Sequence, residues 1–111
     1  MLLHVVLFRP RPDLSDADRR GLGAALESAL RDIPSIRRFR VGRRVVHGAG
    51  YEALMREDLE CAAIVEFDDL AGLQAYLRHP AHQQLGTRFM SSLSASAMYD
   101  YEMVGPTALQ P

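Results

Sequence analysis

Two short segments of this chain are apolar at nearly every position, and they constrain the fold more than any other feature. They are Leu2–Phe8 (LLHVVLF) and Cys61–Phe67 (CAAIVEF). An apolar run of this length, bounded by turn or polar residues, is typical of a β-strand that is buried on both faces, whereas a half-exposed strand would alternate apolar and polar residues. We therefore expect both segments to lie inside one sheet, and we expect both faces of that sheet to be covered.

Helix and strand signals alternate through the rest of the chain. Ser15 and Asp68-Asp69 are N-cap signals, and Pro80 suits the first turn of a helix. The predicted helices cover residues 16–33, 70–79 and 80–93, and further strands cover 36–46 and 96–104. A glycine-rich loop with room for one helical turn, residues 47–60, joins two of the strands and is either a lid over a pocket or an ordinary connection. We expect one domain, residues 1–104, followed by a frayed tail, residues 105–111.

The order β-α-β-β-α(α)-β is that of a ferredoxin-like α+β fold, βαββαβ, with a four-stranded antiparallel sheet. The helices of such a fold cover one face of the sheet. A bare apolar second face would be a large exposed patch, so a second copy of the chain, packed sheet against sheet, is expected to cover it. We therefore predict a symmetric homodimer, a dimeric α+β barrel whose interior holds a small-molecule ligand.

Charge and cysteine content exclude several classes of function. All thirteen basic residues are arginines, so Schiff-base chemistry on a lysine is excluded. A net charge of −1 argues against nucleic-acid and membrane-surface partners. The arginines at 37–44 are interpreted as the solvated side chains of a strand, whose charges protect it from pairing with the strands of other molecules. Cys61 has no partner for an intrachain disulfide, and the apolar N-terminal run is too short for a signal peptide or a membrane span, which together predict a cytoplasmic protein.

Five motifs together resemble the stress-responsive α/β-barrel family: HVVLF, a first helix ending in Ile-Pro, IVEFDD, AYLRHPAHQQ and YDYE. The resemblance spans nearly the whole chain and implies a dimeric α+β barrel. A plant polyketide cyclase of that family forms olivetolic acid by closing an aromatic ring without a cofactor. The resemblance places its catalytic tyrosine and histidine at Tyr76 and His82, with its aspartate at Asp100 behind the histidine. Two of its pocket positions carry other residues here, Cys61 and Leu26, which implies a different substrate.

The residue types themselves support such chemistry. His82 would lie in the first turn after Pro80, where unpaired backbone N–H groups and the helix dipole disfavour an imidazolium and leave the ring able to accept a proton. Tyr76 could donate a hydrogen bond to a carbonyl or enolate oxygen, and Asp100 could orient the histidine. These residues predict cofactor-free proton transfer beside a carbonyl, as in a cyclase or isomerase acting on a small apolar or aromatic metabolite.

Other interpretations of the same residues stay open. Tyr76 and His82 could be a buried hydrogen-bonded pair in a non-catalytic dimeric stress-response protein. His4 and His79 are candidate substrate contacts. His4 could instead be a buried core histidine, and His79 could instead be a helix cap. No metal site is predicted, because the proline between His79 and His82 breaks the helical spacing that a pair of ligands would need. A cofactor-free monooxygenase is a further alternative.

Overall fold

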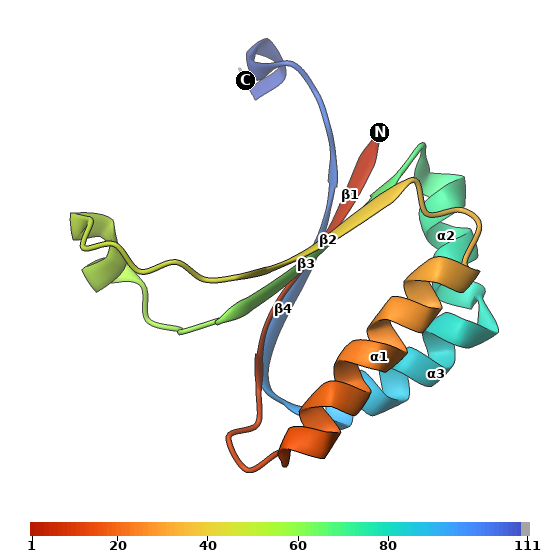
Figure 1. Ribbon diagram of the computed structural model, residues 1–111. Helices are drawn as coiled ribbons and strands as arrows, with labels where there is room; N and C mark the ends of the chain where they lie inside the picture. The colour runs from red at the N-terminus through yellow and green to blue at the C-terminus, as the bar shows by residue number, and fades with distance from the viewer. Residues whose placement is uncertain (110–111) are drawn as a thin grey trace.

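Four antiparallel strands form one sheet in the computed structural model, which describes residues 1–109 (Figure 1). The strands are β1 (Leu2–Pro10), β2 (Arg38–Arg43), β3 (Cys61–Phe67) and β4 (Leu93–Glu102). The helices are α1 (Asp16–Asp32), α2 (Leu70–Arg78) and α3 (Pro80–Ser91), with short 3-10 turns η1 (Gly50–Leu54) and η2 (Pro106–Leu109). The strand order β2-β3-β1-β4 and the βαββαβ connectivity confirm the ferredoxin-like α+β fold.

The helices begin at the capping residues that the sequence indicates. Ser15 Oγ accepts a hydrogen bond from Asp18 N at 3.1 Å, and Asp69 Oδ1 accepts one from Gly72 N at 2.9 Å, so each side chain satisfies a backbone donor that the first helical turn leaves free. Among the described helices, none is both long and apolar enough to cross a membrane.

The strand boundaries differ more from prediction. β2 is shorter than predicted and passes through Gly42 without interruption, because each of its residues pairs with β3. One more backbone hydrogen bond, from Arg44 N to Glu60 O at 2.8 Å, follows the last pair of the ladder. β4 begins earlier than predicted, because its first residues pair with the end of β1: Leu93 is the register partner of Pro10. Ser94 Oγ also accepts a hydrogen bond from Arg9 Nε at 2.9 Å. The segment predicted as a frayed tail contains the turn η2, and its residues 110–111 lie outside the described part.

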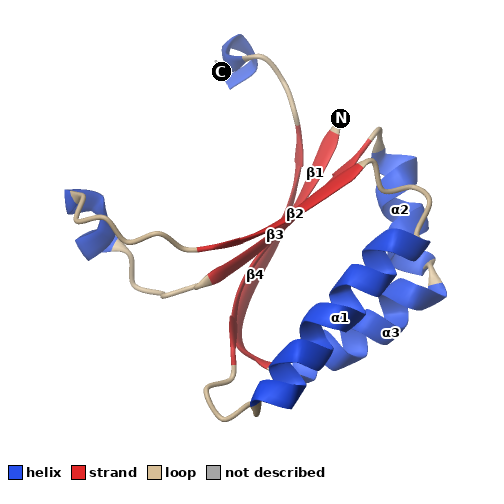
Figure 2. Cartoon of the chain, viewed as in Figure 1, coloured by secondary structure: helices blue, strands red, loops and turns tan. Residues whose placement is uncertain are grey.

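The two faces of the sheet have different surroundings. All three helices lie on one side of it, as Figure 2 shows. Every second residue of β1 and β3 points to that side, and most of these residues are buried, among them Val6, Val65 and Phe67. The alternate residues form the opposite face, here called the open face, which no helix of residues 1–109 covers. Its apolar side chains include Leu3, Val5, Leu7, Ile64 and Tyr99.

The connection between β2 and β3, residues 44–60, projects from the sheet on the side away from the helices (Figure 1). We call this segment the arm. It contains η1, the single helical turn expected in this loop. Because it points away from the helix layer, it does not cover the space between the sheet and the helices of its own chain.

Candidate functional site

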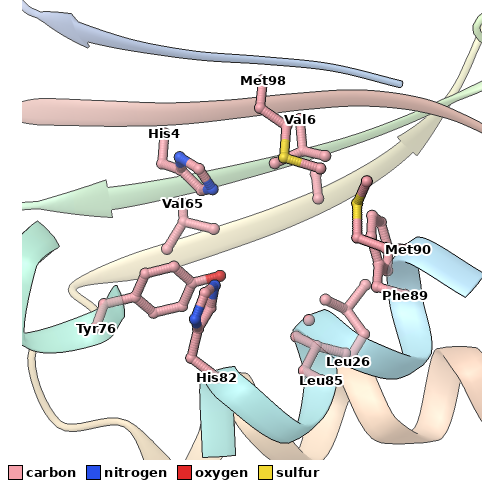
Figure 3. Close-up of a pocket in the computed structure, with 12 residues that line it drawn as sticks. His4, Val6, Leu26, Val65, Tyr76, His82, Leu85, Phe89, Met90 and Met98 are labelled. Carbon is pink, nitrogen blue, oxygen red and sulfur yellow. The ribbon is translucent and has the colours of Figure 1, made fainter. Parts of the chain in front are cut away.

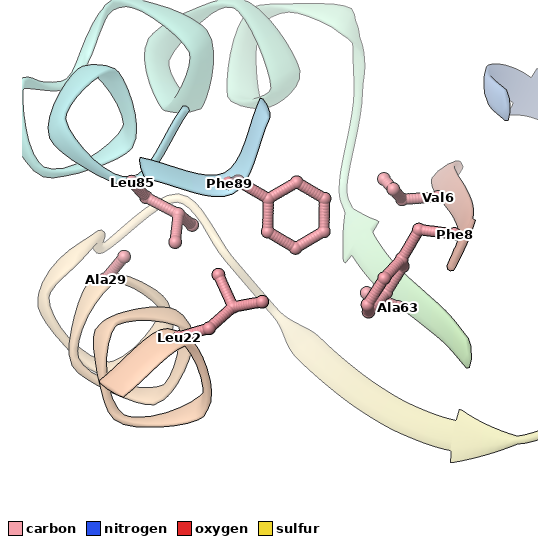
Figure 4. Packing of buried hydrophobic residues seen from close by; sticks show 7 residues of the cluster. All are labelled: Val6, Phe8, Leu22, Ala29, Ala63, Leu85 and Phe89. Carbon is pink, nitrogen blue, oxygen red and sulfur yellow. The ribbon is translucent and has the colours of Figure 1, made fainter. Parts of the chain in front are cut away.

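A cavity of about 180 Å³ lies between the helix-facing side of the sheet and the helices α1, α2 and α3 (Figure 3). Its walls are mostly apolar, and Val6, Leu85 and Phe89 belong both to these walls and to the core cluster drawn in Figure 4. Polar side chains gather at one end only. The ligand space was expected inside a barrel made by two copies of the sheet, but this cavity lies within one chain.

The candidate base is His4, which pairs with Asp100 across the neighbouring strands β1 and β4. The two residues are register partners, and His4 Nδ1 lies 2.6 Å from Asp100 Oδ1. Because an aspartate carboxylate only accepts hydrogen bonds, Nδ1 is the donor, and Nε2 of a neutral His4 ring is then free to accept a proton. His4 is only 8% exposed, and its ring points from β1 into the cavity (Figure 3). This arrangement is that of a histidine base oriented by a carboxylate.

Tyr76 lies opposite His4 on α2 and is held in place by aromatic contacts. Its ring centroid lies 5.2 Å from that of Phe67, 4.4 Å from that of His82 and 5.7 Å from that of His4. Burial, with a smaller contribution from the charge of Asp100, raises the pKa of Tyr76 to about 12. The phenol therefore keeps its proton at neutral pH and acts as a hydrogen-bond donor at the polar end of the cavity.

His82 completes this polar end from the first turn of α3. Burial is the largest cause that lowers its pKa, and His4 lowers it further, while the Leu77 backbone opposes the shift in part. Its Nδ1 atom is buried and has no partner with hydrogen-bond geometry among the described residues. The ring is thus a neutral imidazole at neutral pH, as expected from its place after Pro80.

The lowered pKa of His82 predicts how the stability of the protein depends on pH. An unfolded chain has a histidine pKa of about 6.5, so below about pH 6.5 the unfolded state takes up more protons than the folded state at this residue. We expect the free energy of unfolding to fall as the pH is lowered from about 7.5 to about 5.5, and to fall less steeply in His82→Gln. Urea unfolding at several pH values measures both slopes. His47→Gln, which removes an exposed histidine, is the control and should keep the wild-type slope; equal slopes for wild type and His82→Gln would contradict the assignment.

Of the predicted site residues, His4, Leu26, Tyr76 and His82 line the cavity. Asp100 was expected behind His82, but the structure pairs it with His4 instead. The reason is that β4 pairs directly with β1, and residues in register carry adjacent side chains on one face of the sheet.

The other two predicted residues lie elsewhere. Cys61 packs beside the core cluster of Figure 4, where burial raises the pKa of its thiol. His79 caps α3, and its Nδ1 accepts a hydrogen bond from Ala81 N at 3.1 Å. Neither of them is among the residues that line the cavity. Within residues 1–109, no three histidine, cysteine or acidic side chains converge as metal ligands.

The sequence did not predict the other residues that line the cavity, among them Gly86, Met90 and Met98. A signal for them exists. Gly86 and Met90 follow His82 at intervals of four along α3 and so share its helix face, and Met98 is two residues from Asp100 on β4 and so shares its sheet face.

The fold and the cavity define a ferredoxin-like α+β protein with an apolar pocket that is polar at one end. A family model described as the stress responsive A/B barrel domain matches residues 2–103, and the chain belongs to this family. The resemblance noted in the sequence is thereby confirmed. A search of curated proteins finds no match.

Solved structures share the fold at low sequence identity. A dimeric protein of unknown function from Bacteroides fragilis has 26% identity over 92% of this chain and 95% of its own, with a TM-score of 0.65. A Dabb family protein from Mesorhizobium loti has 19% identity, coverage of 94% and 97%, and a TM-score of 0.73. A hydroxynitrile lyase from Passiflora edulis has 17% identity, coverage of 95% and 96%, and a TM-score of 0.75.

Proposed function

We propose that this protein is a homodimer whose cavity binds a small, largely apolar, carbonyl-bearing compound, and that it transfers a proton on that compound without a cofactor. One observation carries the proposal. The His4–Asp100 pair, Tyr76 and His82 meet at a single end of an otherwise apolar cavity. An apolar pocket with a few convergent polar groups is the usual form of a small-molecule site.

The reaction follows from the roles that the geometry gives each group. His4 Nε2 takes a proton from the carbon beside the carbonyl, and the C–H electron pair moves toward the carbonyl oxygen to form an enolate. Asp100 offsets the charge that develops on the His4 ring. Tyr76 donates its hydrogen bond to the enolate oxygen. Where the enolate is conjugated with a C=C bond, it takes the proton back from His4 at the far carbon of that system. Where the molecule holds a second carbonyl, the enolate carbon attacks it to close a ring, and the oxygen anion that forms takes the proton from His4.

His82 has a supporting role in this scheme. Its neutral ring lies beside Tyr76 with a buried, unpartnered Nδ1, so it is able to bond a second oxygen of the compound or relay a proton to Tyr76. That a relative in fold is named a hydroxynitrile lyase supports acid–base chemistry on this fold.

The homodimer is supported by the open face. Leu3, Val5 and Leu7 of β1 alternate with the buried residues of the same strand, and Ile64 of β3 is 37% exposed beside them. Covering these side chains requires a second apolar surface, and a second open face supplies one. The Bacteroides fragilis relative is described as dimeric, which agrees with this arrangement.

A binding protein without turnover is the second candidate. It is favoured by the continuous aromatic packing of Phe67, Tyr76 and His82, because such a stack would be retained for stability alone.

The test fills the cavity without harming the fold. Gly86 lies on α3 at the cavity, and a Cβ added there meets no atom within 4 Å. Gly86→Leu should therefore place its side chain in the cavity and keep or raise stability, since glycine inside a helix costs about 0.5–1 kcal/mol relative to alanine. In the wild type, an acetophenone or β-keto acid at about a hundred times its Kd should stabilise the fold by about 2.7 kcal/mol in a thermal-shift assay.

We expect Gly86→Leu to lose this shift in melting temperature for every compound that stabilises the wild type. Gly23→Leu is the matched control, because Gly23 is an exposed helical glycine on α1 with the same free space around it. It should keep the shift. Compounds that still stabilise Gly86→Leu bind elsewhere and contradict the proposal, and so does a panel in which no compound stabilises the wild type.

A further inference from the structure

The arm is an ordered element with its own internal contacts. At its base, Arg44 Nη1 donates to Asp58 Oδ1 at 2.8 Å. At its tip, the Glu52 carboxylate accepts hydrogen bonds from the backbone N–H groups of His47 at 3.1 Å and Gly48 at 2.6 Å. Gly48 has a φ of 87°, which glycine adopts without the strain that a side chain would cause. The arm therefore presents its side chains in a defined arrangement.

The tip of the arm is apolar and carries no free carboxylate. Glu52 is the only acidic residue between positions 45 and 55, and its carboxylate is engaged by the arm's own backbone; no lysine or arginine lies in this stretch. Its large exposed side chains are Val45 (75%), Val46 (71%), Tyr51 (60%), Leu54 (74%) and Met55 (56%). Such a cluster marks an interaction surface, and its lack of basic residues does not suit a nucleic acid.

The shape of the chain shows where this surface is directed. The radius of gyration is 15.4 Å, whereas a compact domain of about 100 residues has one of about 13 Å. The arm and the C-terminal turn η2 both extend from the sheet on the side away from the helices (Figure 1). They therefore flank the open face, and the arm is continuous with it, because the arm starts where β2 and β3 end.

We infer that the arm is a clasp that packs its apolar tip against a second copy of this chain. The inference rests on the homodimer proposed above. A partner that covers the open face lies on the side to which the arm points. The apolar side chains of the tip then pack beside apolar residues of that face such as Leu3, Val5 and Ile64, while Arg38, Arg40 and Glu66 form a charged part of the same face. In a two-fold symmetric pair each copy contributes one arm, so every contact made by the tip occurs twice.

The test compares aspartate substitutions by sedimentation equilibrium. Leu54→Asp and Val46→Asp place a carboxylate on the tip, and each should raise the dimer dissociation constant by at least about tenfold, as expected when a charge enters an apolar contact that the dimer buries. Leu70→Asp is the matched control, because Leu70 is 57% exposed on α2, on the helix side of the sheet. It should leave the constant unchanged. Circular dichroism checks that each variant is folded. We expect folded variants, because the substituted side chains are highly exposed.

A fourth variant separates the clasp from the dimer itself. Ile64→Asp lies on the open face and should weaken the dimer whether or not the arm takes part. If Ile64→Asp dissociates the dimer while Leu54→Asp and Val46→Asp match the wild type, the clasp is overturned and the homodimer stands. A wild type that stays monomeric at all concentrations overturns both the homodimer and the clasp, but it leaves the proposed ligand site untouched.

Discussion

Tyr76→Phe is expected to lower kcat/KM for proton transfer on a bound carbonyl compound by about 10²- to 10³-fold, the usual loss when one donor to a developing oxyanion is removed. The variant deletes only the phenolic oxygen. Its ring keeps the contacts with Phe67 and His82, at centroid distances of 5.2 and 4.4 Å, so the cavity keeps its shape. Steady-state kinetics on any compound that the thermal-shift assay identifies measures the effect.

The matched control is Tyr51→Phe, because Tyr51 is an exposed tyrosine of the arm whose hydroxyl lies 3.0 Å from His47 Nε2. It should turn over the same compound at the wild-type rate. A Tyr76→Phe variant that keeps full turnover would remove the phenol from the mechanism. If Tyr76→Phe still binds the ligand and its only change is a loss of about 1 kcal/mol in the free energy of unfolding, the residue is structural and the non-catalytic function is favoured.

Phe67→Ala is expected to lower the free energy of unfolding by about 3–5 kcal/mol, a large part of the total stability of a domain of this size. Phe67 is 0% exposed. It packs in the core cluster that joins the end of β3 to α1 and α2, and its ring also supports Tyr76. Removing the ring leaves a cavity that the surrounding strands and helices cannot close. Urea unfolding followed by circular dichroism gives the measurement.

Phe39→Ala is the control for this loss, since Phe39 is a phenylalanine on the edge strand β2 with an exposed fraction of 36%. Phe39→Ala should lower the free energy of unfolding by only about 1 kcal/mol, because removing a partly exposed ring loses less buried apolar area. Phe67→Leu, which keeps most of the volume, should recover most of the stability that alanine loses. A cost for Phe67→Ala no greater than that for Phe39→Ala would contradict the assignment of Phe67 to the core.

The sequence predicts the fold well because its strongest signals are local. The apolar run Cys61–Phe67 coincides with β3, and Ser15 and Asp69 begin the helices α1 and α2. The ends of β2 and β4 were predicted less well. They depend on how far two strands stay paired, and pairing is decided by residues distant in sequence, such as Arg9 and Ser94.

The candidate site likewise has one part that the local sequence predicts and one part that it does not. Tyr76 and His82 lie six residues apart on two consecutive helices, so their proximity follows from the local sequence. The partnership of His4 with Asp100 spans 96 positions and depends on the register between β1 and β4. A shift of one residue would turn the Asp100 side chain to the opposite face of the sheet, and nothing within either strand alone specifies the register. For this reason the aspartate was assigned to the wrong histidine.

Because β1 and β4 lie side by side, the sheet stays incomplete until its last strand has been made. β1 is made before β4, and one of its two hydrogen-bonding edges stays bare until β4 has been made. Contacts between such distant segments form slowly, and an apolar strand with a free edge pairs readily with other chains. We therefore expect a fragment that ends before Leu93 to keep this edge exposed and to aggregate through it, and not merely to be less stable than the whole protein.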